Sequence, residues 1–200
     1  MRRWLAGLAL VLFWTQAATA GTILIVGDSI SAGLGLDTSR AWVALLEARL
    51  QDEGFEHRVI NASISGDTTT GGLARLPALL EQHRPQVLVI ELGGNDGLRG
   101  QPLARIQGNL EAMVSLAHSV DAKVLLLGMQ LPPNYGERYT RAFAKVFETV
   151  AHDKDVALVP FFLEGVGGVP GMMQSDGIHP AQQAQQRLLD NAWPALEALL

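Results

Sequence analysis

A serine in a short Gly-Asp-Ser string is the first residue with an evident chemical use. The string is Gly27-Asp28-Ser29, and it directly follows a short apolar run. A serine at such a turn can lie at the end of a strand, where free backbone N–H groups can receive negative charge. This arrangement is typical of a nucleophile for acyl transfer, although a serine after a strand is also a common helix cap. The Gly-x-Ser-x-Gly pattern of α/β-hydrolases and the glycine-rich nucleotide-binding loops are both missing here.

Two later loops carry groups that could stabilise developing negative charge. Gly66, in the stretch 61–68, could present an unobstructed N–H, and Asn95, in the stretch 93–97, carries a side-chain amide. A simple turn glycine and an Asx turn are the alternatives for these two residues. Because both loops follow predicted strands, we expect them to converge with Ser29 on one crevice.

A histidine and an aspartate stand three residues apart near the carboxyl end, in Ser175-Asp176-Gly177-Ile178-His179-Pro180. A tight turn here would let Asp176 orient the imidazole of His179, as in the acid–base half of a triad. Proline suits the first position of a helix, so we expect His179 at the start of the last helix. A metal site is the alternative, but no second histidine lies at helical spacing and the chain has no cysteine. The remaining histidines are interpreted as surface residues: His57, His83, His118 and His152.

Short β-rich runs alternate with segments of helical periodicity after residue 20. Several of the runs are continuously apolar, which is typical of strands that are covered on both faces. The five runs are 22–26, 58–60, 86–92, 123–129 and 156–160. Apolar residues at helical spacing mark the segments 42–50, 103–117, 139–150 and 188–196. A further helix near 73–82 contains Pro77 and is predicted to be short or kinked.

This alternation predicts one α/β domain around a mostly parallel sheet, with right-handed crossovers and helices on both faces. In such a sheet, ligands bind beyond the carboxyl ends of the strands, where the strand order reverses. The residues that could do chemistry all follow predicted strands or belong to the loop before the last helix. The architecture and the candidate site therefore support one another.

The first 20 residues have the composition of a cleaved export signal. Arg2 and Arg3 precede an apolar run of 11 residues, 4–14, and small residues follow in Ala18-Thr19-Ala20. A spanning helix needs about 20 apolar residues, so a signal peptide is favoured over an uncleaved anchor. We expect a signal peptide at 1–20 and a hydrolase domain at 21–200.

Composition excludes several classes of protein. The chain is 48% hydrophobic and 18% charged, which is typical of a globular domain. Removing residues 1–20 takes away two of the 15 basic residues and none of the 20 acidic ones, which leaves a net charge of −7. Such a balance, without a basic stripe, argues against nucleic acid as a partner and against tight binding to anionic membranes.

Together these blocks resemble the GDSL or SGNH hydrolase family. Its marker residues Ser, Gly, Asn and His match Ser29, Gly66, Asn95 and His179 in order, and the one departure is Ile30 in place of leucine. The resemblance covers the whole predicted mature chain. It implies a flavodoxin-like three-layer α/β/α sandwich with a five-stranded parallel sheet in the order 2-1-3-4-5.

The resemblance also implies roles for the site residues. Ser29, His179 and Asp176 would form a catalytic triad that needs no cofactor or metal. The oxyanion hole would consist of the Ser29 N–H, the Gly66 N–H and the Asn95 amide.

Within the family, several stretches resemble the small exported subgroup with thioesterase, protease and lysophospholipase activities. These stretches are 61–68, 71–80, 91–100, 131–136 and 174–180. We therefore expect a monomeric periplasmic or secreted enzyme of broad specificity, with acyl-CoA thioesterase, arylesterase and lysophospholipase activity. The alternatives are a carbohydrate O-deacetylase of the same family and a non-catalytic binding protein on the same fold.

Two segments are candidates for contact with the substrate. The stretch 164–174 is rich in glycine and carries Met172 and Met173, which suit a flexible wall for an acyl chain. An ordinary surface loop explains this stretch equally well. Asn134 and Tyr135, after the fourth strand, are the other candidates.

Overall fold

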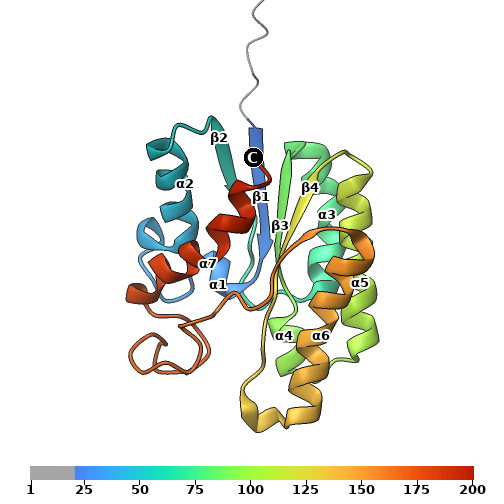
Figure 1. Cartoon of the computed structure of the whole chain (residues 1–200), viewed down its shortest axis with the longest axis vertical. Coiled ribbons are helices and arrows are strands. Elements are labelled where there is room, and N and C mark those ends of the chain that lie inside the picture. Colours follow the sequence, from blue (N-terminus) through green and yellow to red (C-terminus); the bar gives the residue numbers. More distant parts are fainter. Residues whose placement is uncertain (1–20) are drawn as a thin grey trace, which may run out of the picture.

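A parallel five-stranded sheet forms the centre of the protein (Figure 1). The computed structural model describes residues 21–200, so the predicted signal peptide lies outside the described residues. The strands have the order β2-β1-β3-β4-β5, and every neighbouring pair is parallel. Their bounds are β1 (Gly21–Gly27), β2 (His57–Asn61), β3 (Val87–Glu91), β4 (Lys123–Leu127) and β5 (Ala157–Val159). The predicted number, direction and order of the strands are confirmed.

Long helices cover both faces of this sheet (Figure 1). Two of them pack against each other on one face: α2 (Trp42–Asp52) and α7 (Gln185–Glu197). Three form the layer on the other face: α3 (Thr69–His83), α5 (Leu103–His118) and α6 (Glu137–Lys154). The three-layer α/β/α sandwich is thus confirmed. No helix among residues 21–200 is long and apolar enough to cross a membrane.

The core is built around the two central strands, β1 and β3. The side chains of residues 23–26 in β1 and 87–90 in β3 are almost completely buried, as expected for strands between two helical layers. Burying one such aliphatic side chain stabilises the fold by about 1.5–3 kcal/mol. The carboxyl ends of β1 and β3 therefore stand on strands that are buried on both faces.

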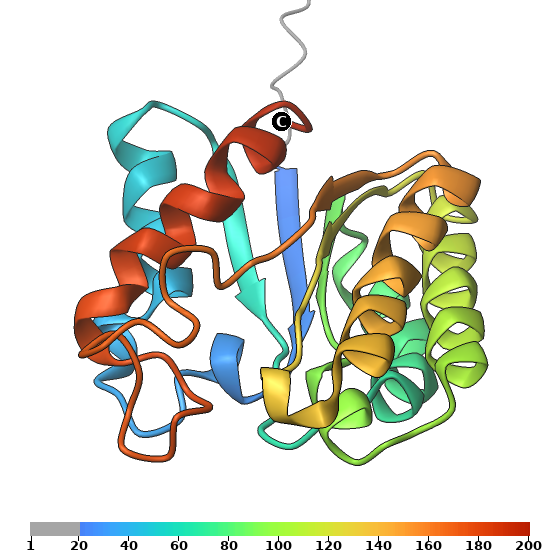
Figure 2. The same ribbon diagram turned by 60° about the horizontal axis from the view of Figure 1, so that its bottom comes forward.

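Short helical elements gather near the carboxyl edge of the sheet, which Figure 2 brings forward. They are α1 (Ser29–Ala32), α4 (Gly94–Leu98) and the 3₁₀ turns η1 (Thr38–Arg40), η2 (Pro133–Tyr135) and η3 (Gln182–Ala184). α1 begins two residues after the end of β1 and α4 begins three residues after the end of β3, whereas η2 lies farther along the segment after β4. The backbone at this edge is therefore held in defined turns.

The structure differs from the sequence predictions at two places. The helix that contains Pro77 is not short, because α3 has 15 residues. Its buried side chains Leu76 and Leu80 pack into the core, which compensates for the backbone hydrogen bond that proline cannot donate. His179 does not begin the last helix either. Hydrogen bonds from Gln174 N to His179 O (2.8 Å) and from Ala181 N to Met172 O (2.8 Å) hold this segment as an irregular hairpin, and α7 starts later.

Candidate active site

Ser29 is the first residue of α1, directly after the end of β1. The helix cap is Asp28, whose Oδ1 accepts a hydrogen bond from Ile30 N at 3.0 Å. The residue that caps the helix is therefore Asp28 and not Ser29. Ser29 is 7% exposed, and its N–H donates to no acceptor among residues 21–200. A hydroxyl and an amide N–H are therefore available at the same turn.

The imidazole of His179 bridges Ser29 and Asp176. Its Nε2 lies 2.8 Å from Ser29 Oγ, and its Nδ1 lies 2.6 Å from Asp176 Oδ2. The other carboxylate oxygen, Asp176 Oδ1, accepts from the N–H groups of Ile178 (2.9 Å) and His179 (3.0 Å). These bonds, above all that with the imidazole, lower the pKa of Asp176 to about 2. The carboxylate is charged at neutral pH and holds the imidazole with Nδ1 protonated.

Glutamine side chains fasten the loop of His179 to the segment that follows Ser29. Gln174 Nε2 donates to Leu34 O at 2.8 Å and to Pro180 O at 3.1 Å. Farther along, Gln185 Oε1 accepts from Trp42 N at 3.0 Å. The sequence interpretation missed these residues, because isolated glutamines give no motif.

Gly66 lies in the loop between β2 and α3 and has a φ of +79°, which favours glycine. Its N–H donates to no acceptor within the described part of the chain, and its carbonyl accepts from Arg99 Nη2 at 3.1 Å. Ile64 N donates to Gly27 O at 3.0 Å, which joins this loop to the end of β1. The loop thus lies beside the turn of Ser29.

Arg75 of α3 holds the same loop from behind. Its Nε and Nη2 lie 2.9 and 2.8 Å from Asp67 Oδ2, and Nη1 donates to Ala62 O. Its Nη2 also lies 3.4 Å from Gly27 O. Because the guanidinium and Asp67 are mostly buried, this pair is a firmer link than an exposed ion pair. One arginine connects α3, the Gly66 loop and β1.

Asn95 lies in α4, which a glycine with a φ of +112°, Gly93, precedes. Asn95 Nδ2 donates to Asp28 Oδ2 at 2.9 Å, and Oδ1 accepts from Arg99 Nη2 at 3.4 Å. A carboxylate can only accept, so this contact fixes which end of the amide carries the hydrogens. Asn95 retains a second N–H for another acceptor.

Asp28 is a buried acid next to the candidate nucleophile. Burial raises the pKa of its carboxyl to about 6, against hydrogen bonds from Ile30 N and the Asn95 amide that lower it. Asp96 is another buried acid at this edge; it accepts from Thr69 Oγ1 at 2.7 Å and Thr69 N at 2.9 Å. Through Thr69 it joins α4 to the start of α3. Both acids accept hydrogen bonds from residues of the turns at this edge, and neither forms a hydrogen bond with His179.

The candidate substrate residues lie on neighbouring segments of the carboxyl edge. Asn134 and Tyr135 are exposed in η2, and the Tyr135 hydroxyl donates to Leu98 O at 3.2 Å, beside α4. Met172 and Met173 are partly buried on the hairpin of His179, where Met173 pairs with Pro180. No hydrogen bond among the described residues joins these four to Ser29.

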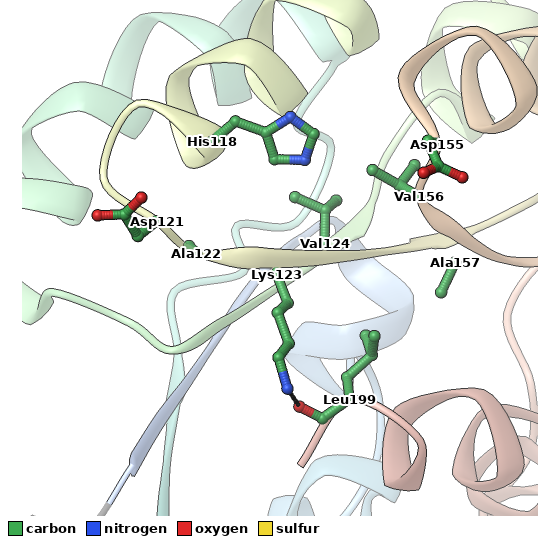
Figure 3. A pocket seen from close by; sticks show the side chains of 9 residues that line it. All are labelled: His118, Asp121, Ala122, Lys123, Val124, Asp155, Val156, Ala157 and Leu199. Carbon is green, nitrogen blue, oxygen red and sulfur yellow. Dashed lines mark hydrogen bonds between the residues drawn. The ribbon is translucent and has the colours of Figure 1, made fainter.

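A surface hollow of about 360 Å³ lies at the opposite, amino edge of the sheet (Figure 3). Lys123 at the start of β4 stands at its centre and donates from Nζ to Leu199 O at 2.6 Å. None of the candidate site residues lines this hollow. The groups that could do acyl chemistry belong to the other edge.

Comparisons with known proteins agree with this geometry. The model of the GDSL-like Lipase/Acylhydrolase family matches residues 25–187. The chain is 66% identical over 193 residues to "Esterase TesA" of Pseudomonas aeruginosa, covering 96% of each chain. It is 48% identical over 189 residues to "Thioesterase 1/protease 1/lysophospholipase L1" of Escherichia coli K12, covering 94% of this chain and 89% of the relative. A crystal structure of TesA superposes with a TM-score of 0.89 at 66% identity, over 90% of this chain and 99% of that one.

Proposed function

Because the chain belongs to the GDSL-like Lipase/Acylhydrolase family and is an ester hydrolase, we propose that Ser29 is its nucleophile. In this proposal His179 is the general base, and Asp176 orients the imidazole of His179. This proposal rests on two short distances, one from His179 Nε2 to Ser29 Oγ and one from His179 Nδ1 to Asp176 Oδ2. A hydroxyl, an imidazole and a carboxylate in this sequence form the standard unit for serine acyl transfer.

In the acylation step, Ser29 Oγ attacks the carbonyl carbon of the substrate and its proton moves to His179 Nε2. The carboxylate of Asp176 accepts from Nδ1–H and stabilises the imidazolium that forms. When the tetrahedral intermediate collapses, the bond to the leaving alcohol or thiol breaks. His179 returns the proton to that leaving group, and the acyl group stays on Ser29.

Three N–H groups are proposed to receive the oxyanion of that intermediate: the backbone N–H of Ser29, the backbone N–H of Gly66 and the free N–H of Asn95. The two backbone groups have no acceptor among residues 21–200, which supports this role. Each sits in a turn fixed by hydrogen bonds, so little reorganisation is needed during the reaction.

Deacylation repeats these steps with water as the nucleophile. His179 takes a proton from a water molecule, the resulting hydroxide attacks the acyl-enzyme, and the proton then goes to Ser29 Oγ as the acid leaves. Besides the substrate and this water molecule, the proposed cycle uses only the residues of the site.

The proposed substrates are acyl esters and thioesters, including acyl-CoA, aryl esters and lysophospholipids. One relative carries esterase in its name, and the other carries thioesterase and lysophospholipase. Large apolar side chains are unusually exposed on the loops of the carboxyl edge, which suits contact with an acyl chain. These side chains are Leu34, Ile64, Tyr135, Val169 and Ile178.

We further propose that residues 1–20 are removed on export and that the mature chain acts as a monomer in the periplasm or outside the cell. The basic start, the apolar run and the small residues before Gly21 support the first point. The amino-terminal sequence of the exported protein tests it, since cleavage after Ala20 would give Gly-Thr-Ile.

The decisive experiment compares the wild-type enzyme with Ser29→Ala on p-nitrophenyl acyl esters, acyl-CoA and lysophospholipid. We expect kcat to fall by at least about 10⁴-fold with all three, since loss of a triad nucleophile removes the covalent route. Ser119→Ala, at the exposed end of α5, is the matched control and should remain fully active. A folded Ser29→Ala enzyme with full activity would refute the nucleophile. Acetylated sugars cleaved far faster than acyl-CoA or lysophospholipid would favour a carbohydrate O-deacetylase.

A further inference from the structure

A second buried carboxyl group lies directly behind the turn of Ser29. Glu91, the last residue of β3, is fully buried. Its Oε2 accepts from Ser31 Oγ at 2.7 Å, from Ser31 N at 3.2 Å and from Asp28 N at 3.3 Å. Glu91 therefore holds the residues on both sides of the candidate nucleophile to the end of the neighbouring strand.

This close approach depends on Gly27, which is paired with Glu91 in the register of β1 and β3. A Cβ atom at Gly27 would lie 2.8 Å from Glu91 Oε2 and 2.9 Å from Ser31 Oγ. The hydroxyl of Ser31 also accepts from Trp42 Nε1 at 3.3 Å. The glutamate is thus part of a packed polar cluster.

The Asp28 carboxyl lies close enough to Glu91 for its charge to act on it, and the Asp28 backbone is bonded to Glu91 Oε2. Two carboxylates cannot share a hydrogen bond unless one of them carries a proton. Both oxygens of Asp28 already accept, from Ile30 N and from Asn95 Nδ2, and Glu91 Oε2 already accepts three hydrogen bonds. Glu91 Oε1 is buried and has no hydrogen-bond partner among the described residues. It is the oxygen left to hold the proton.

We propose that Glu91 remains protonated in the folded enzyme and donates from Oε1 to the Asp28 carboxylate, so that this acid–carboxylate pair positions Ser29 and Asn95. The proton on Glu91 follows from the local contacts alone, whereas the effect on catalysis rests on the proposed function. Burial, and then the adjacent Asp28 charge, raise the pKa of Glu91 well above its ordinary value, which agrees with a neutral acid.

The charged groups around the pair leave Glu91 without a counter-ion. Asp28 lies next to it in the turn after β1. The nearest arginine on α3, Arg75, is bonded to Asp67 and to backbone carbonyls. From α2 the cluster receives only the neutral indole of Trp42. A second negative charge here would have no positive group nearby, so the pair has its lowest free energy when it carries one proton.

The pair acts on the reaction only through other groups. Asp28 takes one N–H of Asn95, which directs the remaining N–H, while Glu91 holds Asp28 N and Ser31 N and so fixes the turn that presents Ser29 Oγ. Both acids are positioning residues. Their loss should lower kcat and leave KM nearly unchanged, because both acids act through the turn of Ser29 and through Asn95.

The first test measures the proton without any substrate. In Glu91→Gln the amide mimics a protonated acid: its NH₂ can donate to Asp28, and its oxygen can accept from Ser31. Wild-type protein takes up a proton at Glu91 on folding above about pH 6, and the variant does not. The folding equilibrium constant of the variant relative to wild type should therefore rise by about tenfold per pH unit, until Glu91 ionises in the folded wild type.

Urea unfolding of both proteins between about pH 6 and pH 9 gives this ratio. Glu81→Gln, an exposed position on α3, is the matched control for loss of one charge, and its ratio should stay flat. A Glu91→Gln ratio as flat as that of Glu81→Gln would overturn the proposal. This arm needs no activity, so it stands apart from any failure of the proposed function.

The second test measures kcat and KM. Glu91→Gln should keep kcat within about threefold of wild type, whereas Glu91→Ala, which removes the donor and the acceptor, should lose more. Asp28→Asn should lower kcat by about 10²-fold, because an amide cannot accept at both ends and the Asn95 contact or the Ile30 contact is lost. Equal losses for Glu91→Gln and Asp28→Asn would overturn the protonation pattern, even if Glu91→Ala does not fold.

Discussion

At the scale of single residues, the amide of Asn95 shows how one hydrogen bond prepares a side chain for another. Asp28 accepts from one N–H, and Arg99 donates to the amide oxygen, so the orientation of the amide is set before substrate arrives. Truncation to Asn95→Ala should lower kcat by about 10²–10³-fold, because one preorganised donor to the oxyanion is lost. Steady-state kinetics on a p-nitrophenyl ester measure this loss.

The unfolding free energy of Asn95→Ala serves as the control for this prediction. It should fall by about 1 kcal/mol, the contribution of a typical hydrogen bond, so the enzyme remains folded. An unchanged kcat in the folded variant would remove Asn95 from the oxyanion hole. A large loss of stability would instead mean that Asn95 supports the turn as a structural residue.

The sequence motifs identified the residues that the structure brings around Ser29, but not the residues that hold them. The motifs assign no role to Asp28 or to Glu91, because their contact joins positions 63 residues apart. The sequence did contain one indication that Glu91 has a structural role. Glu91 is the one acid in the otherwise apolar core of the run 86–92, and a charge in a strand covered on both faces needs a partner.

At the scale of elements, periodicity found the long helices and missed the short ones at the site. The helices α1 and α4 have four and five residues, too few to show a repeat of 3.6. Their positions depend on single residues: Asp28 caps α1, and Gly93 permits the turn into α4. Chain geometry at these two turns decides where Ser29 and Asn95 lie.

The turn into α4 can be tested with Gly93→Ala. Gly93 has a φ of +112°, which side-chain-bearing residues rarely adopt, and a new Cβ atom would lie 3.0 Å from the Phe147 ring. We expect a loss of about 1–3 kcal/mol in unfolding free energy, and a larger fall in kcat than in stability, because Asn95 moves with α4. Urea unfolding and ester hydrolysis measure the two effects.

Gly108→Ala is the matched control for this change. Gly108 is exposed within α5, and a Cβ atom there would meet nothing within 4 Å. Because alanine is the better helix former, this variant should gain up to about 1 kcal/mol and keep its kcat. If Gly93→Ala behaves like Gly108→Ala, the turn into α4 does not require glycine.

At the scale of the whole molecule, the parallel sheet gives the two edges different uses. Every strand runs in the same direction, so all the loops that follow strands meet at the carboxyl edge and all the loops that precede them meet at the other. The alternation of strands and helices was sufficient to predict this layering. The order 2-1-3-4-5 needed the family resemblance, because hydrophobic periodicity does not specify which strands are neighbours.

The acids with shifted pKa values set how stability depends on pH. Asp176, with its pKa lowered to about 2, stabilises the fold above its ordinary pKa, and this contribution is lost as the pH falls toward 2. Asp28 and Glu91 have raised pKa values, so their contribution is complete in acid and is lost as the pH rises, through about 6 for Asp28 and higher for Glu91. The unfolding free energy therefore falls when the pH goes below the ordinary carboxyl pKa, because of Asp176, and also when the pH rises above it, because of Asp28 and Glu91.

We therefore expect the protein to be most stable near pH 5 and to lose about 2–4 kcal/mol of unfolding free energy by about pH 8, since roughly one proton must be taken up on folding across this interval. The net negative charge acts in the same direction, because self-repulsion grows as acids ionise. Raised salt screens that repulsion but leaves the buried pair almost unaffected, so the decline above pH 5 should persist at about 1 M NaCl. Urea unfolding across this range, at low and high salt, measures both parts. A stability maximum near pH 8, or a decline that salt abolishes, would mean that surface charge and not the Asp28–Glu91 pair governs the alkaline side.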